Sequence, residues 1–496
     1  YLMTLTAAYS KNFGEHHLRV LTGYEFLKSY TEFSASKSRD YSMESFIYHK
    51  LNAGAIQNVE SGAWGSSLAS YFGRLSYDYA GKYLLEVNLR ADGASNFTPE
   101  NRWGYFPSVA AGWLLSEEAF MESTKKWLAN LKVRVSYGET GNYNVGDHTM
   151  DYYGVMPWTG WATMFGNTMR IGTEAKGIGN PDITWETTSE LNIGLDIGLL
   201  KNRITLTAEY FNREIRDLLN ELPLMYYFDV NHIYGNIGKT QSRGFEITIN
   251  TVNFDKKDFD WHTTVTLSHY EDRWKERSPL WRPRGYEKAD DYLRPVFDHE
   301  AIGILQPGDL PPDYQPTLIP GYVILKNQDG DDKITEDGDK VLLGTADPYL
   351  IFGVNNALRY KNLDFSVYFY GEAGALRNGS YMENMASVDG SRNMSLYALN
   401  TFSYDNLNAT RPSLLAKGIP KGNWDMQKIF FIRCGNIKLG YTIPISKKIV
   451  SKLHAYVSVD NAFVLTNWIG LDPETDNIAF SYPNVRSYTL GINISF

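Results

Sequence analysis

The chain has 496 residues and a formal net charge of −9, and charged residues make up 21 % of it. This moderate, acidic balance without a basic stripe excludes a disordered polyelectrolyte and predicts no nucleic-acid partner. No apolar run reaches the roughly 18 residues that a membrane-spanning helix needs, so such a helix is excluded. Cys434 is the single cysteine, which excludes an intrachain disulfide, and we interpret it as a small strand residue.

Apolar and polar side chains alternate with a period of two along most of the chain, which predicts β-strands with one apolar and one wet face. In YLLEVNLRAD at 83–92 the polar positions are Glu86, Asn88 and Arg90. We predict about fifteen such strands from the pattern. Their expected spans are 1–10, 16–28, 67–79, 83–92, 105–115, 130–139, 188–200, 203–213, 240–252, 259–270, 349–360, 363–373, 428–442, 453–466 and 484–496.

One segment departs from this pattern. Residues 116–130, SEEAFMESTKKWLAN, have the spacing of a short helix or turn. Ser116 is in the position of an N-cap, and Glu117 and Glu118 follow in the first turn, where acidic side chains are favourable.

The connections between strands alternate between short and long. Tight turns are expected at 11–14, 81–82, 201–202, 255–258 and 361–362. Long irregular stretches are expected near 29–66, 140–187, 214–239, 271–348 and 374–427. A transmembrane β-barrel sorts its connections in this way, with short periplasmic turns at one end and long extracellular loops at the other.

We therefore predict an all-β protein, a transmembrane antiparallel β-barrel in an outer membrane, to which the whole of 1–496 belongs. The apolar set of each strand faces the lipid bilayer, including lipopolysaccharide, and the polar set faces the lumen. The last strand would end on the short-turn side, so counting back makes the first strand begin on the long-loop side. Because a bacterial barrel normally begins from the periplasm with an even strand count, we expect 1–496 to be the C-terminal part of a larger barrel.

Six blocks of sequence resemble the SusC/RagA family, the TonB-dependent outer-membrane transporters of Bacteroidetes. They occur in family order and are NRWGYFPSVAAGWLLSEEAFM, LKVRVSYGETGN, GNPDITWETTSELNIGLDIGLLKNRITLTAEYFNREIRDLL, NIGKTQSRGFEITIN, FIRCGNIKLGYTIP and GLDPET. The closing Phe496 also resembles the C-terminal aromatic that outer-membrane assembly machinery recognises. The resemblance covers most of the chain, 67 to 496.

The resemblance implies a 22-stranded barrel with an N-terminal plug, of which this chain would supply the last fifteen strands and not the plug. It further implies a SusD-like surface lipoprotein as a lid, energy from TonB through a region outside this chain, and import of oligosaccharides or peptides. A dimer of such transporter–lipoprotein pairs is the larger assembly that it suggests.

An acidic stretch at 327–339, NQDGDDKITEDGD, resembles the start of a calcium-binding loop. The candidate positions are Asn327, Asp329, Asp331, Lys333, Asp337 and Asp339. The stretch departs from the pattern because Asp332 replaces the turn glycine and Gly338 stands at position twelve. A solvated Asp- and Gly-rich turn without metal is the alternative.

Tryptophans in the long connections are candidates for stacking on a sugar or anchoring a partner protein. Those that we single out are Trp158, Trp161, Trp274, Trp281 and Trp424, with Trp64 and Trp468 as further loop tryptophans. Packing of the loops or a place in the interfacial belt is the alternative for each. Charged side chains expected on the lumen face, as ordinary wet residues or contacts to a plug, are Glu86, Arg90, Arg134, Asp196, Glu209 and Glu246.

No nucleophile, zinc or phosphate-loop motif is present in the sequence, so we predict that the chain is not an enzyme. Three functions remain open: active import with a SusD-like lid, a passive porin-like channel, and surface binding or adhesion through the loops.

Overall fold

The computed structural model describes residues 1–42, 50–144, 161–165, 168–172, 180–223, 232–379, 394, 396–416, 419–445, 450–475, 482 and 484–496. These fall into two compact units, one of Tyr1–Trp113, Val135–Leu191 and Glu214–Lys239 and one of Leu114–Arg134, Asn192–Arg213 and Thr240–Phe496. None of the helices in the described part of the chain combines the length and the apolar character needed to cross a bilayer.

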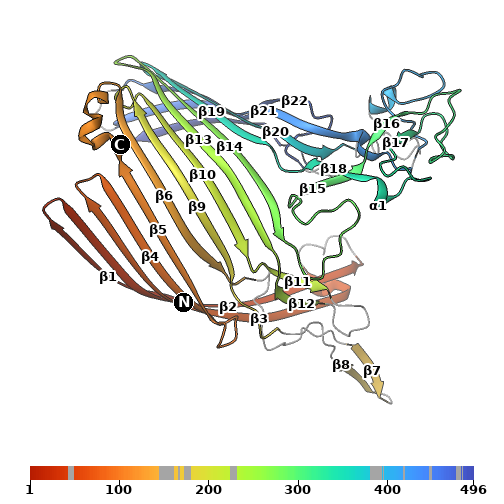
Figure 1. The fold of residues 1–496 in the computed structure, drawn as a ribbon, viewed down its shortest axis with the longest axis horizontal. Helices are drawn as coiled ribbons and strands as arrows, with labels where there is room; N and C mark the ends of the chain where they lie inside the picture. The colour runs from red at the N-terminus through yellow and green to blue at the C-terminus, as the bar shows by residue number, and fades with distance from the viewer. Residues whose placement is uncertain are drawn as a thin grey trace. The chain divides into compact units, whose positions relative to one another are not determined.

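Fifteen strands form one sheet in which each strand pairs with the next long strand along the chain (Figure 1). The strands are β1 (Leu2–Phe13), β2 (His16–Tyr41), β3 (Gly54–Tyr79), β4 (Tyr83–Ala94), β5 (Trp103–Leu114), β6 (Leu128–Asn142), β9 (Glu186–Leu199), β10 (Ile204–Arg216), β13 (Lys239–Lys256), β14 (Phe259–Glu276), β19 (Leu350–Tyr360), β20 (Leu363–Asn378), β21 (Met426–Ile443), β22 (Lys452–Thr466) and β23 (Ser487–Ser495). Each of the fifteen overlaps a predicted span, so the antiparallel all-β architecture is confirmed.

The predicted tight turns at 81–82, 201–202 and 361–362 lie between strands, as expected. Those predicted at 11–14 and 255–258 begin later, because β1 extends to Phe13 and β13 to Lys256. Lys201 and Asn202 have φ values of 60° and 62°, the left-handed conformation that two-residue hairpin turns require. Lys361, between β19 and β20, has a φ of 53°. These turns match the right-handed twist of the strands that they join, which keeps the hairpin partners in register.

The long connections contain short elements of their own. The strands are β7 (Trp161–Phe165), β8 (Thr168–Gly172), β11 (Leu219–Pro223), β12 (His232–Asn236), β15 (Pro295–His299), β16 (Ala301–Ile304), β17 (Val323–Leu325) and β18 (Lys340–Thr345), and they pair β7 with β8, β11 with β12, β15 with β18 and β16 with β17. The helices are η2 (Leu51–Ala53), η3 (Leu115–Glu117), η4 (Ala119–Thr124), α1 (Glu336–Asp339), η5 (Leu396–Asn400) and η6 (Gly422–Asp425).

The prediction of an irregular stretch near 29–66 is wrong for most of its length. β2 continues to Tyr41 and β3 begins at Gly54, with a paired register from His16↔Tyr79 to Tyr41↔Gly54. Most side chains of the added part are exposed, so no buried face imposes the alternation by which the other strands are recognised. Backbone hydrogen bonds and cross-strand contacts maintain the hairpin.

The predicted helix at 116–130 is also corrected. The segment forms two 3₁₀ helices, η3 and η4, and Leu128 already belongs to β6. Ser116 lies buried inside η3 and is not its N-cap, which is Leu114. An extended residue, Glu118, separates the two helices, and so short a segment cannot maintain a continuous α-helical ladder.

Side-chain burial in the sheet is inverted relative to a water-soluble protein. On β4, Leu85, Val87 and Leu89 are exposed by 39 %, 40 % and 54 %, whereas the intervening Glu86 and Arg90 are half-buried. On β23, at the edge of the sheet, both faces are exposed, and its apolar residues Tyr488, Leu490, Ile492 and Ile494 are exposed by 51–79 %. An apolar face of this extent needs an apolar solvent, and the hydrocarbon core of a bilayer provides one.

Buried apolar clusters lie where strands meet the long connections. Trp185 packs against Phe97 and Phe106, with ring centroids 5.3 Å away in both cases, and with Ile183. Its indole N–H donates to the Arg102 carbonyl at 3.0 Å, which satisfies the polar edge of the buried ring. This packing holds the segment before β9 against the ends of β4 and β5.

We predict that Leu490→Arg, in β23, destabilises the protein in lipid by about 2–4 kcal/mol, because a charge would face hydrocarbon. Thr489→Arg, one residue away on the polar face, is the matched control and should cost much less. Denaturant titration of each full-length variant in lipid vesicles, followed by heat-modifiable migration on gels, measures both. Equal losses for the two variants would contradict the assignment of faces.

Candidate functional site

The polar face of the sheet carries charged side chains that are already paired with one another. Arg90 on β4 donates to Asp92 at 2.8 Å, to Ser70 on β3 at 2.8 Å and to Glu25 on β2 at 3.3 Å. One guanidinium therefore links three neighbouring strands. Its donors point to carboxylates and a hydroxyl within hydrogen-bonding distance. The first role of this guanidinium is therefore structural, because it holds the polar face of the sheet together.

A second guanidinium, Arg134 on β6, makes a similar network. It donates to Asp196 at 3.3 Å and Asn192 at 3.4 Å on β9, and to Glu209 on β10. A Cβ at Gly194 would lie 2.4 Å from the guanidinium carbon, so the glycine on the polar side of β9 makes room for Arg134. The glycine pattern of LNIGLDIG thus has a packing cause.

Five of the six predicted lumen charges take part in such contacts. Glu86 accepts from Ser76 at 3.2 Å and from Asn88 at 3.1 Å, and Arg90, Arg134, Asp196 and Glu209 are in the two networks above. The sixth, Glu246, is exposed on β13. The polar face is therefore a hydrogen-bonded, charged surface of the kind that lines a wet lumen.

Sequence reasoning missed the most buried ion pair in the described chain. Arg433 on β21 is 3 % exposed and donates to Asp472 at 2.7 Å and to Glu474. Tyr370 on β20 donates to the same Glu474 at 3.0 Å. The residues of this ion pair are present in two of the family-like blocks. Arg433 is the single arginine of FIRCG, and Asp472 and Glu474 are the two acids of GLDPET, far away in the sequence.

We predict that Arg433→Met destabilises the protein by about 3–5 kcal/mol, because it leaves two carboxylates without their cation. Arg359→Met is the control: its pair with Asp260 is exposed by 58 % on the arginine side, and surface pairs contribute ~1 kcal/mol or less. Equilibrium unfolding in detergent or lipid measures both variants, and a loss of 1 kcal/mol or less for Arg433→Met would contradict a structural role for this pair.

Two of the candidate tryptophans share one neighbour. Trp274 and Trp281 flank Arg277, whose guanidinium carbon lies 4.6 Å and 4.8 Å from the two ring centroids. Desolvation by this packing lowers the pKa of Arg277. Trp158 lies outside the described residues, as does the side chain of Trp161, which begins β7.

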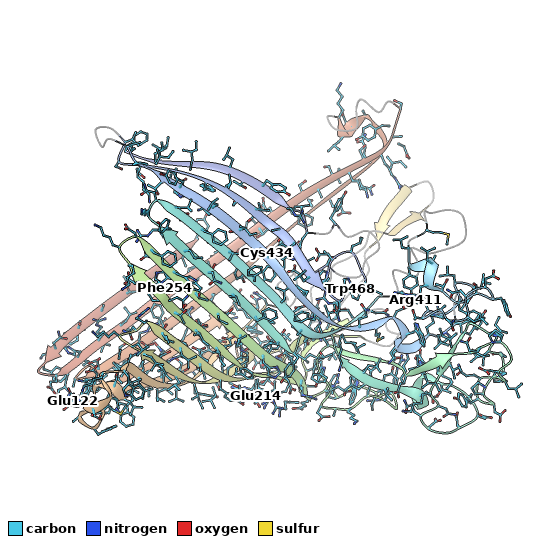
Figure 2. All side chains as sticks on the ribbon, turned by 90° about the horizontal axis from the view of Figure 1, so that it is seen from above. Glu122, Glu214, Phe254, Arg411, Cys434 and Trp468 are labelled. Atoms are coloured by element: carbon cyan, nitrogen blue, oxygen red, sulfur yellow. The ribbon has the colours of Figure 1, made fainter. Side chains whose placement is uncertain are left out.

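The remaining tryptophans have separate surroundings. Trp424, in η6, lines a small cavity of about 170 Å³ together with Arg411. Arg411, labelled in Figure 2, lies over the ring of Tyr397, with its guanidinium carbon 3.6 Å from the centroid. Trp468 is 7 % exposed and packs with Ile429 and Phe431. Trp64 packs against Phe33, with their ring centroids 5.7 Å apart.

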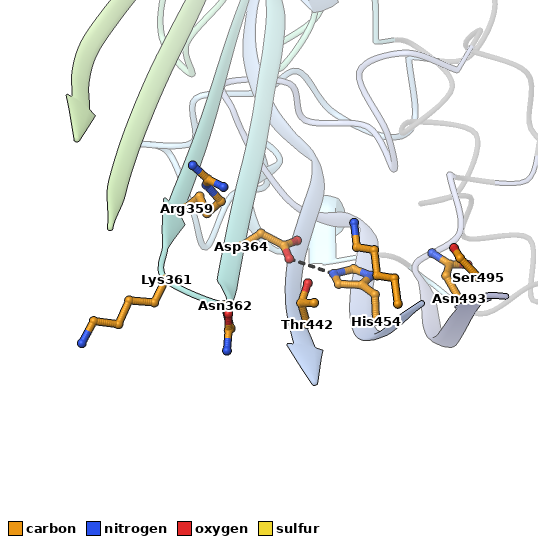
Figure 3. Close-up of a pocket in the computed structure, with 9 residues that line it drawn as sticks. Arg359, Lys361, Asn362, Asp364, Thr442, His454, Asn493 and Ser495 are labelled. Atoms are coloured by element: carbon orange, nitrogen blue, oxygen red, sulfur yellow. Dashed lines mark hydrogen bonds and ion pairs between the residues drawn. The ribbon is translucent and has the colours of Figure 1, made fainter. Parts of the chain in front are cut away.

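A cavity of about 570 Å³ lies at the short-turn end of β19 to β23 (Figure 3). His454 and Asp364 approach each other there, with Nε2 2.8 Å from Oδ1. Lys361 and Lys452 are further basic side chains of its wall. The lining is almost entirely polar, as expected for the lumen side of the sheet near its turns.

The acidic loop 327–339 is held by hydrogen bonds from its own backbone. Asp339 is fully buried and accepts from the Gln328 N–H at 2.8 Å and the Thr335 N–H at 2.7 Å. The Thr335 hydroxyl accepts from the Gly338 N–H and caps α1. Asp339 therefore acts as the internal anchor of the loop.

The candidate metal ligands of the loop make similar turn contacts. Asp329 accepts from the Asp331 N–H at 3.1 Å, Asp331 accepts from the Lys333 N–H at 2.9 Å, and Asn327 accepts from the Gly330 N–H at 2.6 Å. In the part of the chain that the structure describes, no three His, Cys, Asp or Glu side chains form a metal-sized cluster. Calcium binding by this loop stays a prediction from the sequence.

If calcium binds, it should order residues 327–339, and calorimetry should detect a site in the wild type that is lost in Asp329→Ala/Asp331→Ala. Asp313→Ala, in the same connection, is the control for removal of a carboxylate. Equal heats for the wild type and the double variant would refute the calcium assignment.

Comparisons with known proteins agree with this architecture. The family model described as TonB dependent receptor-like, beta-barrel matches residues 3–294. TonB-dependent receptor P3 of Formosa agariphila is 30 % identical over 526 residues, which cover 98 % of this chain and 51 % of that protein. TonB-dependent receptor SusC of Bacteroides thetaiotaomicron is 28 % identical, over 87 % of this chain and 44 % of SusC.

Among solved structures, the RagAB peptide transporter matches with a TM-score of 0.83 at 21 % identity, over 100 % of this chain and 55 % of that one. At this identity the match establishes the fold. The chain spans about half the length of the curated relatives that it matches.

The inverted sheet, the paired charges on its polar face and the family match over more than half of the chain define one class of protein. The chain belongs to the TonB-dependent receptor β-barrel family of the outer membrane. Within that class it is SusC/RagA-like, which confirms the resemblance seen in its sequence. The family consists of receptors and transporters, in agreement with the prediction that the chain is not an enzyme.

Proposed function

We propose that this chain forms the barrel part of an active importer that takes up nutrient oligomers, glycans or peptides, across the outer membrane. The observation that carries the proposal is the match to TonB-dependent receptors over 98 % of the chain, joined to a sheet whose apolar face is exposed and whose polar face is charged. A polar inner surface lets hydrophilic cargo pass, and the apolar outer surface holds the barrel in lipid.

A SusD-like surface lipoprotein is the proposed lid, and TonB the proposed source of energy. Support comes from the comparisons: one relative is named SusC, and a solved structure of the same fold is described as the RagAB peptide transporter. The connection between β14 and β19 is the segment of this chain best suited to meet such a partner, since it builds its own small sheets from β15 to β18 and α1. Trp281 lies near its start and Trp274 near the end of β14, with Arg277 between their rings.

We expect uptake of the cargo by cells that carry the full-length protein to fall to background when TonB is deleted. The reason is that an active importer needs energy from the inner membrane, whereas an open pore needs only a gradient. Uptake of labelled oligosaccharides and oligopeptides in cells with and without TonB measures this. If uptake persists unchanged without TonB, the proposal of active import is wrong and passive, porin-like diffusion takes its place.

A further inference from the structure

A cavity of about 400 Å³ lies at the long-loop end of β14, where this strand meets the ends of β18, β19 and β20. Three tyrosines, Tyr270, Tyr292 and Tyr349, contribute aromatic surface to its wall. The volume suits a side chain or a single sugar ring rather than a whole oligomer.

The carboxylates of this wall differ in how they are satisfied. Glu271 is paired with Arg243 at 3.2 Å and with Arg273 at 3.5 Å. Asp347 is paired with Arg294 at 3.0 Å and also accepts from the Thr345 hydroxyl. Both carboxylates therefore have cations from the protein.

Asp272, which follows Glu271 on β14, also lines the cavity, and its situation is different. Its Oδ1 atom is buried and has no hydrogen-bond partner among the described residues. A buried acceptor without a donor costs about 1–3 kcal/mol, and more when it is charged, so native structures rarely keep one without a use.

The other polar groups of the wall do not supply the missing donor. The ring nitrogen Nδ1 of His269 lies 2.6 Å from the Tyr349 carbonyl. Arg273 donates to Glu271 and the Asp290 carbonyl and lies over the ring of Tyr292, 3.9 Å from its centroid. Lys428 also lines the cavity, but it is exposed and does not donate to Asp272 Oδ1.

We propose that this cavity binds a cationic group of the cargo, a primary ammonium or a guanidinium, with Asp272 as its counter-ion. The tyrosine rings provide faces over which such a cation is favourable. The ion pair would be desolvated, and charge-assisted hydrogen bonds of this kind are the strong ones. This inference rests on the proposed import function and adds to it a preference for cargo that carries basic groups.

The test uses the full-length transporter in lipid nanodiscs and two matched probe pairs. N-acetyl-arginine amide and N-acetyl-citrulline amide have the same shape and differ in charge, and glucosamine and N-acetylglucosamine form the second pair. In the wild type, the cationic member of at least one pair should bind about tenfold more tightly than its neutral partner. Preference in the first pair indicates basic peptides, and preference in the second indicates amino sugars.

Asp272→Asn should abolish this preference without changing the affinity for the neutral probes. Glu276→Gln, a carboxylate loss at the exposed end of the same strand, should retain it. A wild type without preference, or an Asp272→Asn variant that keeps it, would overturn the proposal. TonB-dependent uptake of neutral cargo by wild-type and Glu276→Gln cells reports on import separately, so the failure of one idea can be told from the failure of the other.

Discussion

The structure depends on one constraint: a backbone that crosses hydrocarbon must satisfy its N–H and C=O groups internally, because lipid provides no donors or acceptors. The chain meets it by pairing each long strand with its neighbours in one fifteen-stranded sheet. Once the backbone is satisfied in this way, side chains can be apolar on the outer face. The exposure of Leu89 and Leu490 is therefore a direct consequence of the environment, not a defect of packing.

The same constraint moves the stabilising contacts of the molecule away from a central core. Apolar clusters such as that of Trp185 form where strands continue into long connections, and ion pairs such as Arg433 with Asp472 attach a returning segment to the sheet. The polar face is stabilised by guanidinium networks that reach across two or three strands. Most of these polar groups are paired, so a described group that is buried without a partner, such as Asp272, stands out.

Much of the architecture could be predicted from the sequence. A buried or lipid-facing strand face demands strict alternation, and that alternation located all fifteen strands of the sheet. The pattern failed where this demand ends: the outer parts of β2 and β3 are exposed, so nothing in their sequence reports the hairpin that they form. It also failed at 116–130, where helical spacing is real but η3 and η4 are too short for an α-helix.

The sequence by itself determined where the strands and most turns lie and how side chains divide into a lipid face and a wet face, because each follows from neighbours one to four residues apart. Only the tertiary structure decided which distant groups meet: Arg134 with Glu209, Arg433 with Asp472, and the wall that leaves Asp272 without a donor. Such contacts depend on register and on how the long connections return to the sheet. Those are properties of the whole chain, and no local pattern encodes them.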